Sequence, residues 1–411
     1  MCTENKGNSM KLTSSVMIST ALLTMMAPAM AQSAAPAPGV IKTASGIDLI
    51  PSLQVGMKHD DNVVRSNSNE IKSWVNTISP ALKAMLVDGA DTYTLTTALN
   101  HASYFSSHED DFTDGYLDGE ARLSPASNHN FKIKANTSWL HEDRGTGVSE
   151  GRGLLLDEVT RFQSQLLDGE YTYGSQSSTG KIRLNSRYFN KDYKNFRDVT
   201  QYRDYDSTLF GGAFLYQTQG AFKLVASANT AEIDFKVLDL SGDRNNTDNN
   251  YRLGLEWEMS SITSGELKVG YQDKNFDRAE REDFSGFAWE AILVWQPLTY
   301  SGFDIATGRR AKDVDAVNVL GDFIIETTYG LGWNHQWSDT WDSKVAYEYQ
   351  TNEYNLSSRK DTSKVITLEL NKQLLRWVKL KAFANIEDRT STLGIIEFVR
   401  TVIGLNAEFT L

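Results

Sequence analysis

The chain has 411 residues, with 53 acidic against 41 basic side chains and a formal net charge of −12. Nucleic acid is excluded as a partner, because no basic stripe offsets the acidic excess. The single cysteine, Cys2, precedes the leader cleavage site described next, so the mature chain has no thiol for disulfides or thiolate metal sites.

Residues 1–31 have the pattern of a secretory signal peptide. Lys11 supplies a positive charge, residues 16–26 form an apolar run, and Ala29-Met30-Ala31 is a small-x-small cleavage site. The run is too short to cross about 30 Å of hydrocarbon as a helix. We therefore expect Sec-type export, cleavage after Ala31, a short periplasmic segment at 32–46 and a single domain at 47–411.

Beyond that segment, apolar and polar residues alternate at period two, which predicts strands with one apolar face. Phe131, Ile133 and Trp139, for example, oppose Lys132 and Lys134. Eighteen strands are predicted, at about residues 48–58, 71–86, 92–104, 115–123, 131–140, 160–173, 181–190, 203–216, 222–231, 250–259, 266–274, 285–295, 302–310, 322–336, 342–350, 363–371, 378–387 and 397–411. The strand at 203–216 is the least regular, because bulky side chains fall on both of its faces, at Leu209, Phe210, Phe214 and Leu215.

The connections between these strands alternate in length. Short ones are expected at 87–91, 124–130, 174–180, 217–221, 260–265, 296–300, 337–341 and 372–377, and longer ones at 59–70, 105–114, 141–158, 191–202, 232–249 and 275–284. Short periplasmic turns and longer external loops are typical of outer-membrane barrels. Hydrocarbon offers no hydrogen-bonding partner to the backbone groups at an open strand edge, so the sheet must close on itself. The sequence thus predicts an all-β fold, a transmembrane antiparallel up-and-down β-barrel integral to the bacterial outer membrane.

Both ends of the strands carry further signals. Tryptophans prefer the level of the lipid headgroups, and five lie beside short connections while Trp74 and Trp139 lie near the opposite strand ends; the five are Trp257, Trp295, Trp337, Trp341 and Trp377. The chain ends on an apolar-faced strand that includes Phe409 and Leu411. Such a strand is expected to close the barrel and to be recognised by the barrel-assembly machinery. Outer-membrane lipid and lipopolysaccharide are the expected surroundings.

The face opposite the apolar one is predicted to line a water-filled pore, as in barrels of 16–18 strands. It carries charges of both signs. The candidate pore-lining residues are Lys132, Lys134, Lys181, Arg183, Arg187, Arg252, Glu256, Glu258, Lys268, Glu290, Glu326, Lys344, Glu348, Lys379 and Lys381. Two interpretations stay open. The charges either neutralise one another on a hydrated wall, or form a polar track for a hydrophilic polymer.

No catalytic set is apparent, because the six histidines lie mostly in or beside loops and no nucleophile motif accompanies them. Residues 243–248 offer oxygen atoms at alternate positions but lack the glycine and glutamate of a calcium loop. The acidic run at 108–111 is interpreted as solvated. Glycines at 145, 147 and 151 have the wrong spacing for a dinucleotide motif and predict a mobile loop. We expect no enzyme activity, no cofactor and no metal site.

The start of the predicted barrel has a distinctive order of motifs. A strand from Pro51 leads to Asp60-Asp61-Asn62-Val63, and the next strand reaches Ser79-Pro80-Ala81-Leu82. This opening resembles the putative beta-barrel porin 2 family, and so do Asp143-Arg144-Gly145, Trp295-Gln296-Pro297 and Thr307-Gly308-Arg309 further along. The resemblance covers most of residues 48–411.

The resemblance implies an outer-membrane exit pore for a capsular polysaccharide or exopolysaccharide, working with a periplasmic polysaccharide export protein and its glycan. It supplies no catalytic residues. The alternative is a general or solute-selective diffusion porin for small hydrophilic molecules. A constriction loop folded into the lumen would favour that alternative, and no loop sequence clearly predicts one. A barrel enzyme or adhesin is disfavoured by the missing active site and the modest loops.

Overall fold

The computed structural model describes residues 39–218, 220–259, 262–314 and 321–410, so the predicted signal peptide lies outside the described residues. Eighteen antiparallel strands form a ring in which each pairs with the next and the last pairs back with the first. They are β2 (Asp48–Asp60), β3 (Ser73–Asp88), β4 (Asp91–Tyr104), β5 (Phe112–Ala126), β6 (His129–Glu142), β7 (Thr160–Tyr173), β8 (Gly180–Tyr193), β9 (Tyr205–Gln217), β10 (Phe222–Phe235), β11 (Asn246–Met259), β12 (Thr263–Phe276), β13 (Phe284–Leu298), β14 (Ser301–Asp313), β15 (Phe323–Ser338), β16 (Trp341–Tyr354), β17 (Lys360–Leu375), β18 (Val378–Ser391) and β19 (Phe398–Thr410). The predicted closed barrel is confirmed.

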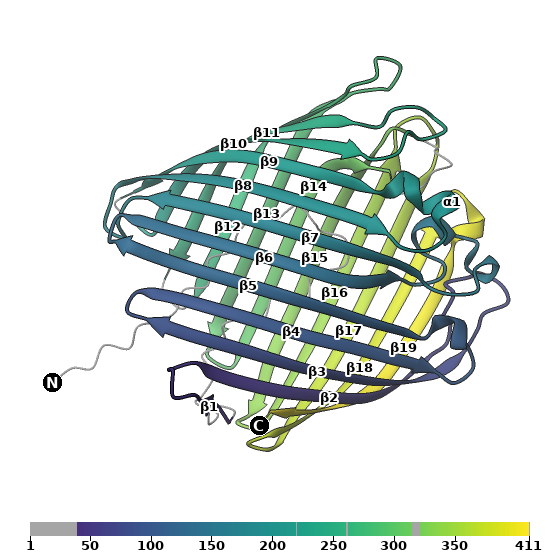
Figure 1. Cartoon of the computed structure of the whole chain (residues 1–411), viewed down its shortest axis with the longest axis horizontal. Coiled ribbons are helices and arrows are strands. Elements are labelled where there is room, and N and C mark those ends of the chain that lie inside the picture. Colours follow the sequence, from purple (N-terminus) through teal and green to yellow (C-terminus); the bar gives the residue numbers. More distant parts are fainter. Residues whose placement is uncertain (1–38, 219, 260–261, 315–320, 411) are drawn as a thin grey trace.

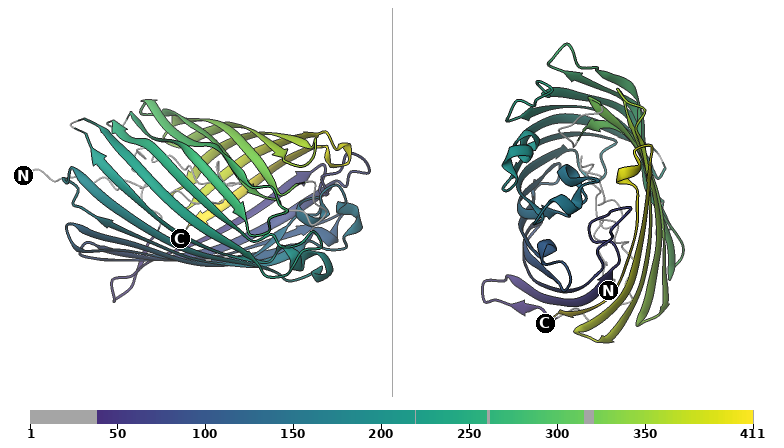
Figure 2. Two further views of the ribbon diagram at one scale, coloured as in Figure 1. Left: turned by 90° about the horizontal axis from the view of Figure 1, so that it is seen from above. Right: turned by 90° about the vertical axis from the view of Figure 1, so that its right-hand side faces the viewer.

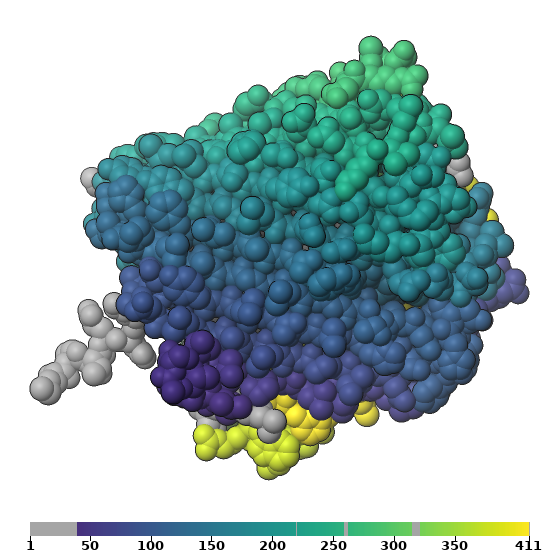
Figure 3. Space-filling view, in the orientation of Figure 1, coloured from purple at the N-terminus to yellow at the C-terminus, as the bar shows by residue number. Residues whose placement is uncertain are grey.

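The barrel is flattened rather than round. Figure 2 shows an oblong cross-section, in which β5 to β10 form one long wall and β13 to β19 the facing wall. The strands run obliquely across both walls (Figure 1), and side chains make the near wall a continuous surface (Figure 3). A short strand β1 (Ile41–Lys42) pairs with the start of β2, within the segment predicted to be periplasmic. Among the described residues, no helix has both the length and the apolar composition needed to cross a bilayer.

The connections differ in length at the two ends of the barrel, as the sequence predicts. One end has short connections at 89–90, 127–128, 174–179, 218–221, 260–262, 299–300, 339–340 and 376–377. The other end, which we call the mouth, has connections at 61–72, 105–111, 143–159, 194–204, 236–245, 277–283, 314–322, 355–359 and 392–397. Short helical turns lie in several of the latter, including the helix α1 (Arg197–Thr200).

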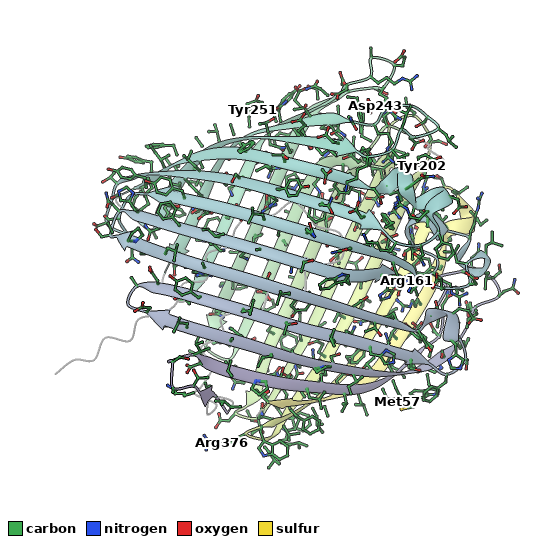
Figure 4. The ribbon with its side chains drawn as sticks, in the orientation of Figure 1. Met57, Arg161, Tyr202, Asp243, Tyr251 and Arg376 are labelled. Carbon is green, nitrogen blue, oxygen red and sulfur yellow. The ribbon has the colours of Figure 1, made fainter. Side chains whose placement is uncertain are left out.

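The two faces of the sheet differ as the alternation predicts. Large apolar side chains such as Leu253 are exposed on the outer face, and Met57 and Tyr251 project from it in Figure 4. Most charged residues of the strands face inward, although Lys364 and Asp388 pair with each other on the outer face. An ion pair of 3.5 Å joins Arg183 on β8 to Glu256 on β11. Neighbouring strands lie about 4.8 Å apart, so side chains that skip two strands can meet only across the concave inner face.

Strand β9 resolves the irregular pattern in its sequence. Phe210 and Phe214 are exposed on the outer face, whereas Leu209 and Leu215 are buried on the inner one. On β10, Val225 pairs with Leu215 and is also buried. Bulk on both faces therefore reflects an inner wall that is locally apolar, and not a shift of register.

One seam departs from regular pairing near the mouth. The β13–β14 ladder ends at Trp289 and Arg309, although β14 continues to Asp313. The side-chain amide of Gln272 on β12 takes the place of the missing partner. It donates to the carbonyl of Ala311 at 2.9 Å and accepts from the Ala311 N–H at 2.8 Å. These side-chain hydrogen bonds satisfy the backbone N–H and carbonyl of Ala311, which lie beyond the end of the pairing with β13.

Candidate functional site: the pore wall and its mouth

All fifteen predicted pore-lining residues lie on the inward side of the strand register, spread around the ring rather than gathered at one point. Many form ion pairs with inward neighbours. Glu120 draws Lys132 and Lys134 together, and the other pairs are Arg183 with Glu170 and Glu256, Arg187 with Asp168, Arg252 with Glu290, Lys268 with Glu266, Glu326 with Arg310 and Lys312, Lys379 with Asp342, and Lys381 with Glu369. Glu258 is exposed near a short connection, and Glu348 is buried on β16. These pairs fit the interpretation of a wall whose charges neutralise one another.

The residues of the Asp60-Asp61-Asn62 motif lie where the barrel closes. Asp60, at the end of β2, is fully buried, and it accepts hydrogen bonds from Arg400 of β19. The Arg400 Nε lies 3.0 Å from Oδ1 and its Nη2 lies 2.5 Å from Oδ2. Such a two-pronged guanidinium–carboxylate contact fixes both partners in one plane. It joins the first and last strands of the ring.

The next two motif residues extend this junction into the loop at 61–72. Asp61 accepts the backbone N–H of Thr401 at 2.6 Å. The Asn62 amide donates to the carbonyls of Ser66 and Val399, at 2.8 and 2.9 Å. The motif thus ties the loop to β19 and closes the seam beyond the last ladder pair.

The second part of the motif shapes the neighbouring seam. The Ser79 hydroxyl donates to the Asn100 side chain of β4 at 2.9 Å. The β3–β4 register runs from Ile78 directly to Ala81, so the ladder is interrupted at Pro80. Proline has no N–H to donate, which accounts for the break.

The loop at 61–72 also fills part of the lumen. Val63 of this loop is buried against Val75, Ala102 and Tyr104, which lie on the inner faces of β3 and β4, and Ile71 packs against the same cluster. An apolar cluster on the inner face removes water from this side of the pore. The open path is therefore narrower here than the strand count alone suggests.

The loop at 143–159, which we call the strap, begins beside that cluster. Asp143 forms a 2.8 Å ion pair with Arg65, and buried Arg144 binds Asp110 at 2.5 Å. Burial alone would raise the pKa of Asp143, but the Arg65 guanidinium and the hydrogen bond from His141 outweigh it and hold this pKa well below its usual range. The carboxylate is therefore ionised at neutral pH, and the base of the strap is fixed by charge.

The far part of the strap reaches the other long wall. Glu150 contacts Arg359, just before β17, at 2.6 Å and Arg389, on β18, at 2.5 Å. Both arginines also bind Asp361. In the end-on view of Figure 2, segments of the mouth lie between the two walls. The strap, which leaves from β6 and returns to β7, thus bridges from one wall to the other.

Two glycines allow the strap to pass this closely. Gly145 has φ +87°, and a Cβ there would lie 2.0 Å from the carbonyl oxygen of Val64. Gly151 has φ +68°, and a Cβ there would meet Ile396 at 2.9 Å. Both positions need the left-handed region and close backbone approach, which favours glycine. The sequence predicts a mobile loop at these glycines, whereas in the structure they pack the strap closely against its neighbours.

Sequence reasoning also missed the residues that hold the strap. Glu150 meets partners 209 and 239 residues further along the chain. No local sequence pattern predicts a contact between residues so far apart in the chain. The nearest sequence signal is the motif Asp143-Arg144-Gly145, which marks the base of the strap but does not include Glu150.

The acidic segments considered as metal sites have other contacts. Asp110 binds Arg144, and His108 lies 3.3 Å from Asp111. Asp243 accepts the backbone N–H of Asn245 at 3.0 Å. Within the described ranges, no group of three or more His, Cys, Asp or Glu side chains is placed to hold a metal ion.

Several solved structures match the chain at low sequence identity. The chain resembles OccK2 (OpdF) of Pseudomonas aeruginosa with 10% identity and a TM-score of 0.49, covering 91% of this chain and 99% of that one. A BenF-like porin from Pseudomonas fluorescens Pf-5 is 10% identical with a TM-score of 0.47, covering 88% and 99%. The siderophore receptor PirA of P. aeruginosa is 9% identical with a TM-score of 0.44, covering 88% and 80%.

A search of curated protein sequences found no match. The sequence profile of one family matches residues 48–411, which is the whole barrel from the first residue of β2 onward. This match agrees with the resemblance in the opening motifs, of which Asp60-Asp61-Asn62 lies at the closing seam and Ser79-Pro80 at the neighbouring β3–β4 seam. The chain belongs to the family described as putative beta-barrel porin 2.

Proposed function

We propose that this barrel is a diffusion porin of the outer membrane for small hydrophilic molecules. The observation that carries the proposal is the strap, which is bound at its base by Arg65 and at its far part by Arg359 and Arg389. A loop held across the mouth limits the size of a solute that enters. The charged inner wall suits water and polar solutes, which need hydrogen-bonding partners along the way.

The polysaccharide exit pore is supported less well. A hydrated polymer needs one continuous wide path, whereas the strap and the apolar cluster around Val63 reduce the open cross-section. To widen the path, the strap would have to give up partly buried ion pairs, which is costly because it leaves unpaired charges behind. This alternative is supported by the wide strand count, by the two-sign polar lumen and by the resemblance of the opening motifs.

The remaining parts of the proposal follow from the sequence. Residues 1–31 direct Sec-type export, the barrel-assembly machinery inserts the chain, and the outer face contacts lipid and lipopolysaccharide. The proposal includes no catalytic step, cofactor or metal ion.

Releasing the far part of the strap is expected to widen the pore. Glu150→Gln leaves Arg359 and Arg389 without their strap carboxylate, so the ion pairs that hold the strap are lost. Single-channel conductance in planar bilayers should rise, with more frequent current fluctuations. The matched control is Glu353→Gln, which removes the same charge from an exposed ion pair with Lys360 near the same rim. Exposed pairs contribute little, so the control should conduct as the unaltered protein does.

Solute flux separates the two functions. Liposomes that contain the protein should swell in solutions of small sugars or amino acids, and a strain without the gene should keep its surface polysaccharide. If the liposomes show no flux and the deletion strain loses that polysaccharide, the exit-pore alternative is correct and the diffusion porin is wrong.

A further inference from the structure

The contact that holds the strap has the geometry of a carboxylate-binding site. The Nη2 atoms of Arg359 and Arg389 each approach a different oxygen of Glu150, at 2.6 Å and 2.5 Å. One guanidinium per carboxylate oxygen is an arrangement that gives strong, directional hydrogen bonds. Nothing in this geometry requires the carboxylate to belong to the chain itself.

The wall supplies more positive than negative charge at this place. Asp361, which is 1% exposed, accepts from Arg359 at 2.7 Å and from Arg389 at 3.0 Å. Asp361 is itself held by the Ser391 hydroxyl at 2.6 Å. Two guanidiniums thus share one wall carboxylate, so one positive charge is balanced only by Glu150. If Glu150 leaves, the half-enclosed site requires another anion.

The wall also holds the arginines in place without the strap. The Arg359 guanidinium lies over the Tyr354 ring, 4.3 Å from its centroid, and it bonds Asp361 through a second nitrogen, Nε, at 3.1 Å. The Nε of Arg389 is buried and has no hydrogen-bond partner among the described residues. Glu150 and Asp361 therefore leave one buried donor of this pair of arginines unused, the Nε of Arg389.

We propose that Arg359 and Arg389 form a binding site for small monocarboxylate solutes, in which Glu150 is a tethered occupant. The inference rests on the proposed diffusion function and names its substrate class. The Glu150 side chain is 20% exposed, so solvent reaches the site. A free carboxylate that replaces Glu150 also releases the far part of the strap, which couples binding to passage.

The test uses the full-length protein with Glu150→Gln in detergent and acetate as the probe. Thermal unfolding midpoints are measured in sodium acetate and in sodium chloride of equal ionic strength. Above half-saturation, each tenfold increase in acetate should raise the midpoint of the variant by a constant increment, because a ligand of the folded state stabilises it logarithmically. The unaltered protein should shift less, since the tethered Glu150 competes at high effective concentration.

Two further variants locate the binding. One variant combines Glu150→Gln with Arg389→Lys, and the other combines it with Arg359→Lys. Each keeps the positive charge but removes one guanidinium, so the acetate shift should be lost. Either variant suffices if the other does not fold. Equal midpoints of Glu150→Gln in acetate and chloride would overturn the proposal. An acetate shift of the same size in Glu353→Gln, in both double variants and in the unaltered protein would also overturn it, as a general salt effect.

The binding measurement needs no conduction, and conduction in potassium chloride needs no carboxylate. A protein that conducts small ions but shows no acetate shift contradicts only this inference. A protein that binds acetate but passes no small solute contradicts the diffusion porin instead.

Discussion

Replacing Arg400 by methionine is expected to lower the free energy of unfolding by about 3–5 kcal/mol, because it leaves a buried charge without its partner. Asp60 is fully buried and receives both prongs of the Arg400 guanidinium. Methionine keeps most of the apolar stem but offers no donor. The loss should appear in reversible denaturant unfolding of the protein in lipid or detergent.

The matched control for this variant is Lys381→Met on the adjacent strand β18. Lys381 also faces the lumen, but it lies 3.5 Å from Glu369 with more than a third of its side chain exposed. Its removal should cost less than about 1 kcal/mol, as for other exposed ion pairs. Losses of equal size in the two variants would mean that the seam contact contributes no more than an ordinary pore-wall pair.

Leu99→Arg is expected to cost about 2–4 kcal/mol, because it places a charge in the hydrocarbon near the middle of the membrane. Leu99 lies near the centre of β4 and is 53% exposed on the outer face. The same unfolding assay in lipid vesicles measures the loss.

The neighbouring residue provides the control. Ala98 points inward, where it pairs with Tyr116 of β5 and Ala81 of β3. Ala98→Arg therefore places the same charge toward the pore, and its cost should stay below about 1 kcal/mol. If Ala98→Arg proves the more harmful of the two, the inner and outer faces of β4 have been assigned the wrong way round.

The strands and their faces were largely predictable because a barrel wall imposes a local rule. Each residue faces either lipid or water, so alternation along segments such as 131–139 determines both strand and face without knowledge of distant partners. The rule was hardest to read on β9, where Leu209 and Leu215 make the inner face apolar too. Even there the predicted bounds of 203–216 are close to the observed bounds of β9, Tyr205–Gln217, because the flanking connections limit the register.

The mouth was much less predictable, because its contacts join residues far apart in the sequence. The seam residues Asp60 and Asn62 could be singled out as a motif, but not their partners on β19. Glu150 has neither a motif nor a periodic position, and its role follows only from where the strap lies. Loops obey no face rule, so their packing depends on tertiary contacts.

The order of strands in the ring has a consequence for how the protein folds. Of the eighteen pairings that complete the ring in the described chain, all but one join consecutive strands. Consecutive strands are joined by connections of at most seventeen residues, so these contacts cost little chain entropy and can form early. The exception brings β2 to β19, with Asp60 and Arg400 separated by 340 residues. This closure cannot begin until the last strand has been delivered. Until then, the edge of β2 beyond its short pairing with β1 is unpaired, and some other strand or factor must protect it.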